Sequence, residues 1–397
     1  MTERKTDPST DAVLVLNAGS SSVKFALFEA DGLDVLCRGG IEGIGGAARF
    51  GGASGPDASL FDGPSLPADA DHERATRWLL DGLRGAPGLT LRAAGHRVVH
   101  GGPDFAAPVR VDEIVLAALE RLVPLAPAHQ PHNLAAIRAV GRAWPDLPQV
   151  ACFDTAFHRT QSRLAQIFAI PRDLTDEGLV RYGFHGLSYQ HIADVLPGIA
   201  GERAAGRVIV AHLGHGASLC AMRDRRSIAT TMGFTALDGL MMGTRCGAID
   251  PGLVLHLIEE RGMAPAEVSH LLNRRSGLLG VSGLSNDART LSESADPRAA
   301  EALDLFAYRV VREAGSMMAA LGGLDLLVFT AGIGERSARL RKGICEGLAW
   351  AGLALDAARN EAGQGRISAS GSAIEAYVIP ADEERAIARA VSNLRLR

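Results

Sequence analysis

Two segments of the chain, residues 13–28 and 208–222, share one pattern: an apolar strand, a turn of glycine and small polar residues, and a second apolar strand. Such a turn lets an anion approach its main-chain N–H groups closely, because glycine has no Cβ atom and serine adds a hydroxyl donor. Each turn therefore predicts a phosphate-binding site. Their repetition indicates two duplicated half-domains that hold a polyphosphate, and hence phosphoryl transfer.

A third glycine-rich segment follows the apolar run 324–330 and precedes a helical pattern. A helix that begins directly after a buried strand presents N–H groups to an anion or a nucleotide. The pair Gly332 and Gly334 lacks the third glycine and the acidic residue about 20 positions on that a dinucleotide site requires. The chain also has no Walker-type P-loop, so the sequence predicts a nucleotide site of another kind.

The length of 397 residues predicts two domains, because one hydrophobic core rarely serves a chain of this size. A formal net charge of −4 and the lack of basic runs argue against a nucleic-acid partner. No stretch has the length and apolar character of a bilayer span or a signal peptide, which predicts a cytoplasmic protein without a membrane partner. The five cysteines form no C-x-x-C pair, so we expect reduced, mostly buried thiols.

Periodicity predicts helices over residues 187–196, 297–321 and 383–394, and a short strand over 149–153 that ends at Asp154. Ser188 is a candidate N-cap of the first of these helices. We place the domain boundary near Asp154 and expect an α/β fold. Residues 1–154 form the first domain, with 385–397 packing back onto it, and residues 155–384 form the second, which carries the nucleotide site.

Ten short motifs occur in the order typical of one enzyme family: NAGSSSVK (17–24), GHRVVHGG (95–102), FDTAFH (153–158), RYGFHG (181–186), HLGHGAS (212–218), MGFT (232–235), GLMMGTR (239–245), SGLLGVSG (276–283), FTAGIGE (329–335) and VIP (378–380). Over nearly its whole length the chain resembles the acetokinase family of short-chain carboxylate kinases, within the actin, Hsp70 and sugar-kinase superfamily. The resemblance implies two duplicated actin-like (ribonuclease H-like) domains that face each other across a nucleotide cleft. It also implies reversible, direct in-line transfer of the ATP γ-phosphoryl group to acetate, and a homodimer.

The resemblance assigns roles to residues of this chain. Arg97 and Arg245 match the arginines that hold the carboxylate and the phosphoryl group in transit, which suits the planar fork of a guanidinium. His185 matches the histidine that donates to the transferring phosphoryl group, and His129 a supporting one. Asp154 and Glu383, with Asn17, match the residues that position Mg²⁺ (or Mn²⁺) against ATP or ADP.

The remaining matches concern the small-molecule substrates. The residues expected to contact the nucleotide and its phosphates are Asn17, Ser20, Ser21, Ser22, Lys24, His212, Gly214, His215, Gly216, Asp287, Ala288, Arg289, Gly332, Ile333, Gly334 and Arg336. The residues expected to line the acyl pocket are Val99, Ala128, Phe184 and Ala236.

Several positions depart from the family pattern. His215 replaces an asparagine, so nucleotide affinity becomes sensitive to pH, and Arg336 replaces another asparagine near the adenosine. Ala128 and Ala236 replace a leucine and a proline, which predicts a wider acyl pocket and leaves a propionate or other short-chain acyl kinase as the alternative. Tyr189 stands where the family usually has histidine. An inactive nucleotide-binding regulatory protein is the alternative outside the enzymes.

Overall fold

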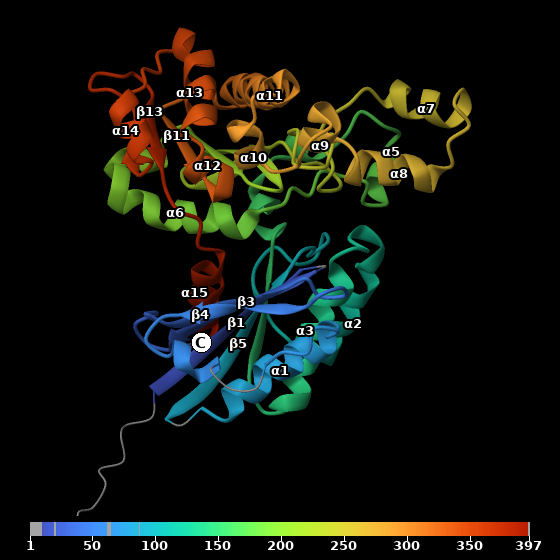
Figure 1. Ribbon diagram of the computed structural model, residues 1–397, viewed down its shortest axis with the longest axis vertical. Coiled ribbons are helices and arrows are strands. Elements are labelled where there is room, and N and C mark those ends of the chain that lie inside the picture. The colour runs from blue at the N-terminus through green and yellow to red at the C-terminus, as the bar shows by residue number, and fades with distance from the viewer. Residues whose placement is uncertain (1–9, 20, 62–64, 87, 396–397) are drawn as a thin grey trace, which may run out of the picture. The chain divides into compact units, whose positions relative to one another are not determined.

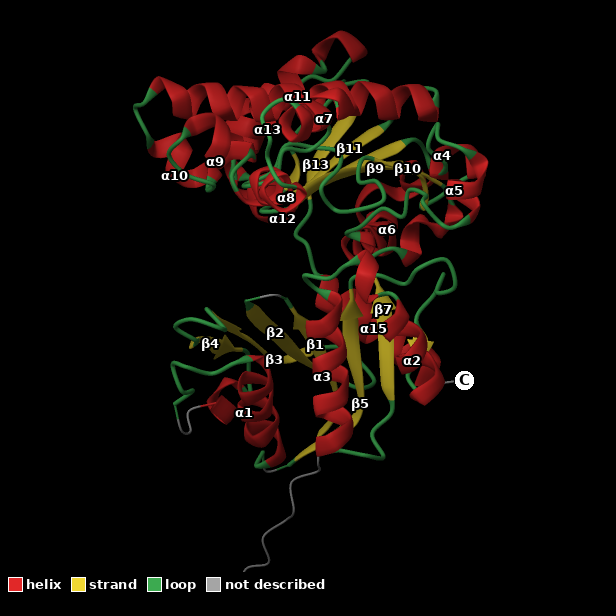
Figure 2. Ribbon diagram, turned by 90° about the vertical axis from the view of Figure 1, so that its right-hand side faces the viewer, coloured by secondary structure: helices red, strands yellow, loops and turns green. Residues whose placement is uncertain are grey.

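The computed structural model describes residues 10–19, 21–61, 65–86 and 88–395. Within this part the chain forms two compact units. The first ends at Ala156 and resumes at Asp382, and the second runs from Phe157 to Ala381. Each unit is a mixed β-sheet with helices on both faces (Figures 1 and 2). Asn17, Arg97, Asp154 and Glu383 therefore belong to the same unit.

The sheet of the first unit has the order β4-β3-β2-β1-β5-β7-β6 in the described residues. Its strands are β1 (Thr10–Ala18), β2 (Ser22–Glu29), β3 (Val35–Glu42), β4 (Arg49–Ser54), β5 (Leu89–Val98), β6 (Val109–Arg110) and β7 (Gln149–Phe153). Strand β1 pairs antiparallel with β2 and parallel with β5, and β5 pairs parallel with β7. The carboxyl ends of β1, β5 and β7 consequently meet at one edge of the sheet, where α/β proteins bind ligands.

Helices cover both faces of this sheet, and alternation along β5 shows which helix covers which face. The helices are α1 (His72–Arg84), α2 (Glu113–Arg121), α3 (Gln130–Ala143) and α15 (Glu383–Arg395). Ala94 belongs to the core that α1 and α3 share with the sheet. The next residue, Gly95, points to the other face, where a Cβ atom would lie 2.5 Å from Ile387 of α15. Asp382 accepts from the main-chain N–H of Arg385 and from Arg38 of β3, which anchors α15 to this unit.

The second sheet has the order β10-β9-β8-β11-β13-β12 in the described residues. Its strands are β8 (Val208–Leu213), β9 (Ala217–Arg223), β10 (Arg226–Thr230), β11 (Leu326–Thr330), β12 (Gly365–Arg366) and β13 (Glu375–Val378). The helices of this unit are α4 (Arg163–Gln166), α5 (Arg172–Asp176), α6 (Gly186–Ala200), α7 (Pro251–Glu259), α8 (Pro265–Arg274), α9 (Gly277–Ser282), α10 (Ala288–Glu293), α11 (Pro297–Leu321), α12 (Ala331–Arg336), α13 (Ala338–Gly347) and α14 (Ala357–Ala362). Helix α6 packs on one face, and α11 packs on the other (Figures 1 and 2).

The two sheets repeat one topology. In the series β3-β2-β1-β5-β7 the first two pairings are antiparallel and the last two parallel. The series β10-β9-β8-β11-β13 has the same pairings in the same order. The two turns recognised in the sequence join the equivalent hairpins β1–β2 and β8–β9. The duplicated α/β fold expected from these hairpins is confirmed.

The helix predictions agree with the structure at α11 and α15, but the prediction for Ser188 is wrong. Helix α6 begins at Gly186, one residue before the predicted start. The preceding residue, His185, has a left-handed conformation (φ 59°) and makes no side-chain cap. The Ser188 hydroxyl instead bonds Nδ1 of His212 at 2.8 Å. Ser188 lies in the first turn of α6, where its hydroxyl can bond a residue of a neighbouring strand. Local sequence does not reveal that partner.

The thiols agree with the expectation of reduced, mostly buried cysteines, since all five are free and only Cys246 is not fully buried. Burial raises the pKa of Cys37 to about 11 and those of Cys152, Cys220 and Cys345 to about 12. Thiols with such pKa values are protonated at neutral pH and are poor nucleophiles. Across the described chain, every helix is too short or too polar to cross a membrane.

Gly95 gives a test of how α15 packs on the first sheet. Gly95→Ala should lower the free energy of unfolding by ~1–3 kcal/mol, because the new methyl group collides with branched side chains of Ile387 and Val391. Urea unfolding monitored by the fluorescence of Trp78 and Trp144 reports on this unit. Gly46→Ala is the matched control, since its Cβ meets only an ordinary contact at 3.7 Å. Equal stability of the two variants would contradict the close packing.

Candidate active site

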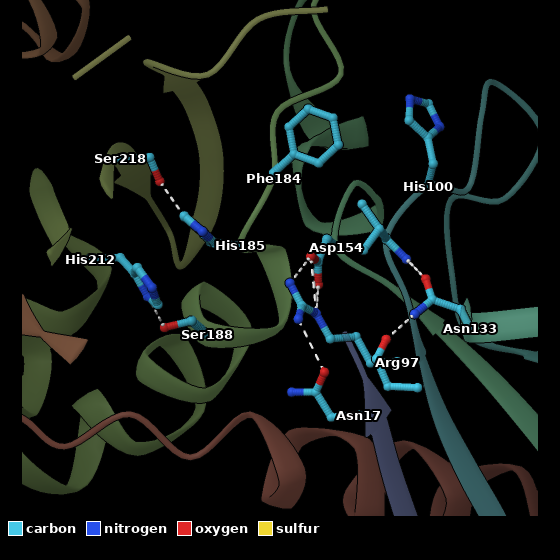
Figure 3. A network of polar contacts seen from close by, with 12 residues as sticks. Asn17, Arg97, His100, Asn133, Asp154, Phe184, His185, Ser188, His212 and Ser218 are labelled. Carbon is cyan, nitrogen blue, oxygen red and sulfur yellow. Dashed lines mark hydrogen bonds and ion pairs between the residues drawn. The ribbon is translucent and has the colours of Figure 1, made fainter. Parts of the chain in front are cut away.

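Three polar side chains of the first unit gather at the carboxyl ends of its parallel strands (Figure 3). Asn17 lies near the end of β1, Arg97 near the end of β5, and Asp154 directly after β7. Nε and Nη2 of Arg97 donate to the two carboxylate oxygens of Asp154 at 3.0 and 2.6 Å. Nη1 donates to Oδ1 of Asn17 at 3.1 Å. The three residues that sequence motifs singled out are thus joined by one guanidinium group.

The electrostatics of this edge are dominated by carboxylates. Burial opposes the charge of Arg97, but Asp154 and Glu383 raise the pKa of its guanidinium overall. Burial also raises the pKa of Glu383 to about 7; the charge of Arg97 lowers it, and those of Asp154 and Glu384 raise it again. Three carboxyl groups, those of Asp154, Glu383 and Glu384, thus lie near two cations, Arg97 and Lys24, and a further cation would balance the excess of acidic groups.

This surplus fits the Mg²⁺ that the family resemblance implies. Asp154 and Glu383 supply carboxylate oxygens, and Asn17 supplies an amide oxygen, all hard ligands of the kind that Mg²⁺ prefers. No group of three or more histidine, cysteine, aspartate or glutamate side chains in the described residues is arranged as a self-contained metal site. In many Mg²⁺ sites one or two protein carboxylates are completed by phosphate oxygens and water.

The first phosphate turn is closed by main-chain bonds and anchored from α1. The N–H of Gly19 donates to the carbonyl of Ser22 at 2.8 Å. The carbonyl of Gly19 accepts from Nε2 of His72, on α1, at 2.7 Å. Ser21 and Lys24 are exposed beside it, as an anion-binding role requires. Ser20, also predicted to contact phosphate, lies outside the described residues.

Asn133 (Figure 3) and Gln130 were not identified from the sequence, yet they position this site from the first turns of α3. Asn133 is 1% exposed. Its Nδ2 donates to the carbonyl of Ala18 at 2.6 Å and its Oδ1 accepts from the N–H of Val99 at 3.0 Å. Gln130 exchanges two hydrogen bonds with the main chain of His100. These two amides tie the ends of β1 and β5 to one helix, and no local sequence pattern distinguishes them from the other polar residues of α3.

The second unit brings His185 and Arg245 to its phosphate turn. Nδ1 of His185 bonds the hydroxyl of Ser218 at 2.9 Å (Figure 3). A Cβ atom at Gly216 would lie 2.9 Å from Nη2 of Arg245 and 3.0 Å from Nε2 of His185. The two predicted donors therefore meet over Gly216, and only glycine leaves room for both. This convergence matches the cradle expected from the sequence.

Arg245 differs from Arg97 in that no carboxylate of the described residues pairs with it. Among the described residues its guanidinium has a single recorded hydrogen bond, from Nη1 to the carbonyl of Ala236 at 2.6 Å. Burial and the nearby charge of Arg274 lower its pKa. A partly buried cation with only a neutral acceptor is poised to bind an anion, because a charge-assisted bond replaces lost solvation.

The other predicted nucleotide residues of the second unit gather around the same turn. A Cβ atom on Gly214 would lie 3.6 Å from Cβ of Ala331, at the start of α12, so the turn lies beside the 331–334 motif. Nε2 of His215 accepts from Nδ2 of Asn286 at 3.2 Å, which brings residues 287–289 close as well. Asp287 itself caps α10, accepting from the main-chain N–H groups of Arg289 and Thr290. The remaining predicted residues of this group are Ala288, Gly332, Ile333, Gly334 and the exposed Arg336.

The predicted acyl-pocket residues divide between the units. Val99 and the exposed Ala128 lie in the first unit, and the buried Phe184 and the half-buried Ala236 lie in the second. His129 is the exposed residue that precedes α3. The pocket therefore stays a prediction. Val99 lies two residues after Arg97, and the carbonyl of Ala236 accepts from Arg245.

Asn133 gives a test of how the first half of the site is held. Asn133→Ala should lower the free energy of unfolding by ~1–3 kcal/mol or more, because it leaves the buried carbonyl of Ala18 and N–H of Val99 without partners. The measurement is urea unfolding followed by tryptophan fluorescence. Asn393→Ala, at an exposed position of α15, is the matched control. If both variants unfold like the unmodified protein, Asn133 does not anchor these strands.

Comparison with known proteins agrees with this architecture. The family model described as the acetokinase family matches residues 12–389. An acetate kinase of Rhodopseudomonas palustris is 53% identical over 393 residues, 97% of this chain and 98% of that protein. The crystal structure of Porphyromonas gingivalis acetate kinase superimposes with a TM-score of 0.87 at 36% identity, covering 98% of this chain and 100% of that one.

A propionate kinase from Francisella tularensis is equally similar in fold. Its crystal structure gives a TM-score of 0.89 at 36% identity and covers 96% of this chain and 98% of that one. Both arginines, the histidine and the acidic residues described above lie within the matched residues. The chain belongs to the acetokinase family.

Proposed function

We propose that this protein is an acetate kinase, which transfers the γ-phosphoryl group of ATP to acetate and forms acetyl phosphate and ADP in a reversible reaction. The observation that carries the proposal is Arg245, a partly buried guanidinium that shares the space above Gly216 with Nε2 of His185. Two donors aimed at one point, without a carboxylate on Arg245 to neutralise them, are suited to a phosphoryl group in transit.

The reaction needs no general base, because the attacking carboxylate is already ionised at neutral pH. A carboxylate oxygen attacks the γ-phosphorus, and the bond to the β–γ bridging oxygen breaks with its electron pair leaving on ADP. Catalysis then depends on holding two anions in line and stabilising the charge on the transferred group. Arg97 would orient the carboxylate, while Arg245 and His185 would donate to the phosphoryl oxygens.

The acidic edge of the first unit would hold the metal. Asp154, Glu383 and Asn17 are the proposed ligands of Mg²⁺ or Mn²⁺, which when bound supplies positive charge to the phosphate oxygens. Arg97 orients the Asp154 carboxylate by donating from Nε and Nη2 to its oxygens. The glycine turns and residues 287–289 and 332–336 would bind ATP or ADP.

The choice of acid depends on the residues expected to line the acyl pocket. Ala128 and Ala236 stand where the family usually places larger side chains, so propionate or butyrate should be used relatively well beside acetate. An additional buried methylene contributes only ~1–3 kcal/mol of discrimination. We retain acetate as the proposed principal substrate, with a longer short-chain acid as the alternative.

A hydroxamate-trap assay tests the activity and the choice of acid together. Purified protein with MgATP and acetate, propionate or butyrate should yield acyl hydroxamate, because hydroxylamine captures the acyl phosphate. Arg245→Ala should lower the rate by roughly a hundredfold or more, as loss of a charge-stabilising donor does in other enzymes. Arg339→Ala, an exposed arginine of the same unit, is the matched control and should keep full activity.

The outcomes separate the alternatives. Specificity constants for propionate and butyrate far below that for acetate would exclude the wider pocket, and the reverse order would favour the longer-chain kinase. ATP binding without product from any acid would instead support the inactive regulatory protein.

We also propose that the protein is a cytoplasmic homodimer, as the family resemblance implies. Helix α7 supports an interface in the second unit, since none of its residues is buried and Leu253 and Leu255 are 46% and 54% exposed. An apolar exposed helix of this kind marks a contact surface. Light scattering coupled to size exclusion should give twice the mass of one chain, and a monomer at micromolar concentration would exclude the dimer.

A further inference from the structure

We propose that Tyr189 and Ser218 are positioning residues for His185, and that they hold its imidazole in the tautomer whose Nε2 carries the proton. The proposal rests on the proposed function, in which Nε2 donates to the phosphoryl group. It also explains Tyr189, which stands where the family usually has histidine. Neither Tyr189 nor Ser218 is required to touch a substrate.

The three side chains form a continuous hydrogen-bonded row. Tyr189 on α6 and Ser218 on β9 are both fully buried. The Tyr189 hydroxyl bonds Oγ of Ser218, and Oγ bonds Nδ1 of His185 at 2.9 Å (Figure 3). Because α6 begins right after His185, the helix that places Tyr189 also fixes the main chain of the histidine.

The donor and acceptor in each of these hydrogen bonds follow from the single proton that each hydroxyl can donate. In the described residues Ser218 is the only hydrogen-bond partner recorded for the Tyr189 hydroxyl. If that hydroxyl accepted from Ser218, its own proton would be buried without an acceptor, which is costly. Tyr189 therefore donates to Ser218, and the one proton of Ser218 is donated to Nδ1 of His185. With Nδ1 accepting, the proton of the neutral ring is on Nε2.

The rest of the environment is consistent with this tautomer. Nε2 is the atom that approaches Gly216 beside Nη2 of Arg245, so its proton points toward the phosphate turn. His212 stacks on the His185 ring with centroids 4.1 Å apart and limits rotation of that ring. Burial raises the pKa of Tyr189 well above 10. A phenol there keeps its proton across the working pH range, whereas an imidazole at the same place would gain and lose one.

The tautomer can be read directly by ¹⁵N NMR of protein labelled at histidine, with the His185 signals identified from a His185→Gln sample. At a pH where the ring is neutral, we expect Nδ1 to show the shift of an unprotonated nitrogen and Nε2 that of a protonated one. Ser218→Ala should remove this preference and give a mixture of tautomers. A proton on Nδ1 in the unmodified protein, or an unchanged tautomer in Ser218→Ala, would overturn the proposal.

Kinetics distinguish positioning from a structural role. Tyr189→Phe should lower kcat by about tenfold or more, the usual scale for loss of an outer hydrogen-bond partner, while KM for ATP and acetate stays nearly constant. In a His185→Ala background the same substitution should have no further effect, because the group that it positions is gone. An equal loss in both backgrounds would show that Tyr189 acts on the fold instead.

A matched control and the spectroscopic readout complete the test. Tyr377 is a buried tyrosine of the same unit whose hydroxyl donates to Glu375, so Tyr377→Phe should leave kcat unchanged. If no acid is phosphorylated, the proposed function fails, yet the NMR experiment still decides which nitrogen of His185 carries the proton. The two proposals can therefore fail separately.

Discussion

The ion pair between Arg97 and Asp154 is the interaction on which the polar cluster of the first unit depends. Both groups are largely withdrawn from water, with side chains 21% and 2% exposed. Removing two charges from water is unfavourable unless their geometry is good and their remaining bonds are made. Parallel pairing of β5 with β7 meets that condition, since it brings the two strand ends together and lets the guanidinium fork reach both carboxylate oxygens. A further bond from Arg97, to Oδ1 of Asn17, extends the constraint to β1.

The duplicated units use the same topology for different electrostatic tasks. In the first, carboxylates outnumber the cations around Arg97, which suits a metal ion. In the second, Arg245 is held by a main-chain carbonyl and stays available to an anion. The surroundings of Arg97 therefore favour a cation in the first unit, and those of Arg245 favour an anion in the second. The two units have equivalent turns but different charges beside them.

Polar groups next to the charged residues carry out the positioning. Asn133 joins the ends of β1 and β5, and Ser218 orients the ring of His185. These amide and hydroxyl groups are neutral, so they hold the neighbouring residues in place without adding charge. Gly216 contributes because it has no side chain, since a Cβ atom there would collide with both Arg245 and His185.

The sequence alone determined the family, the duplicated hairpins, helices α11 and α15, and most of the polar residues at the two turns. Those features depend on local chemistry: glycine in tight turns, apolar periodicity, and charged residues within short motifs. The tertiary structure decided that Ser188 bonds His212 and leaves α6 uncapped, that Asn133 bridges two strands, and that Tyr189 reaches Ser218. Each of these is a contact between segments distant in the chain, and such a partner is chosen by packing, which no local pattern encodes.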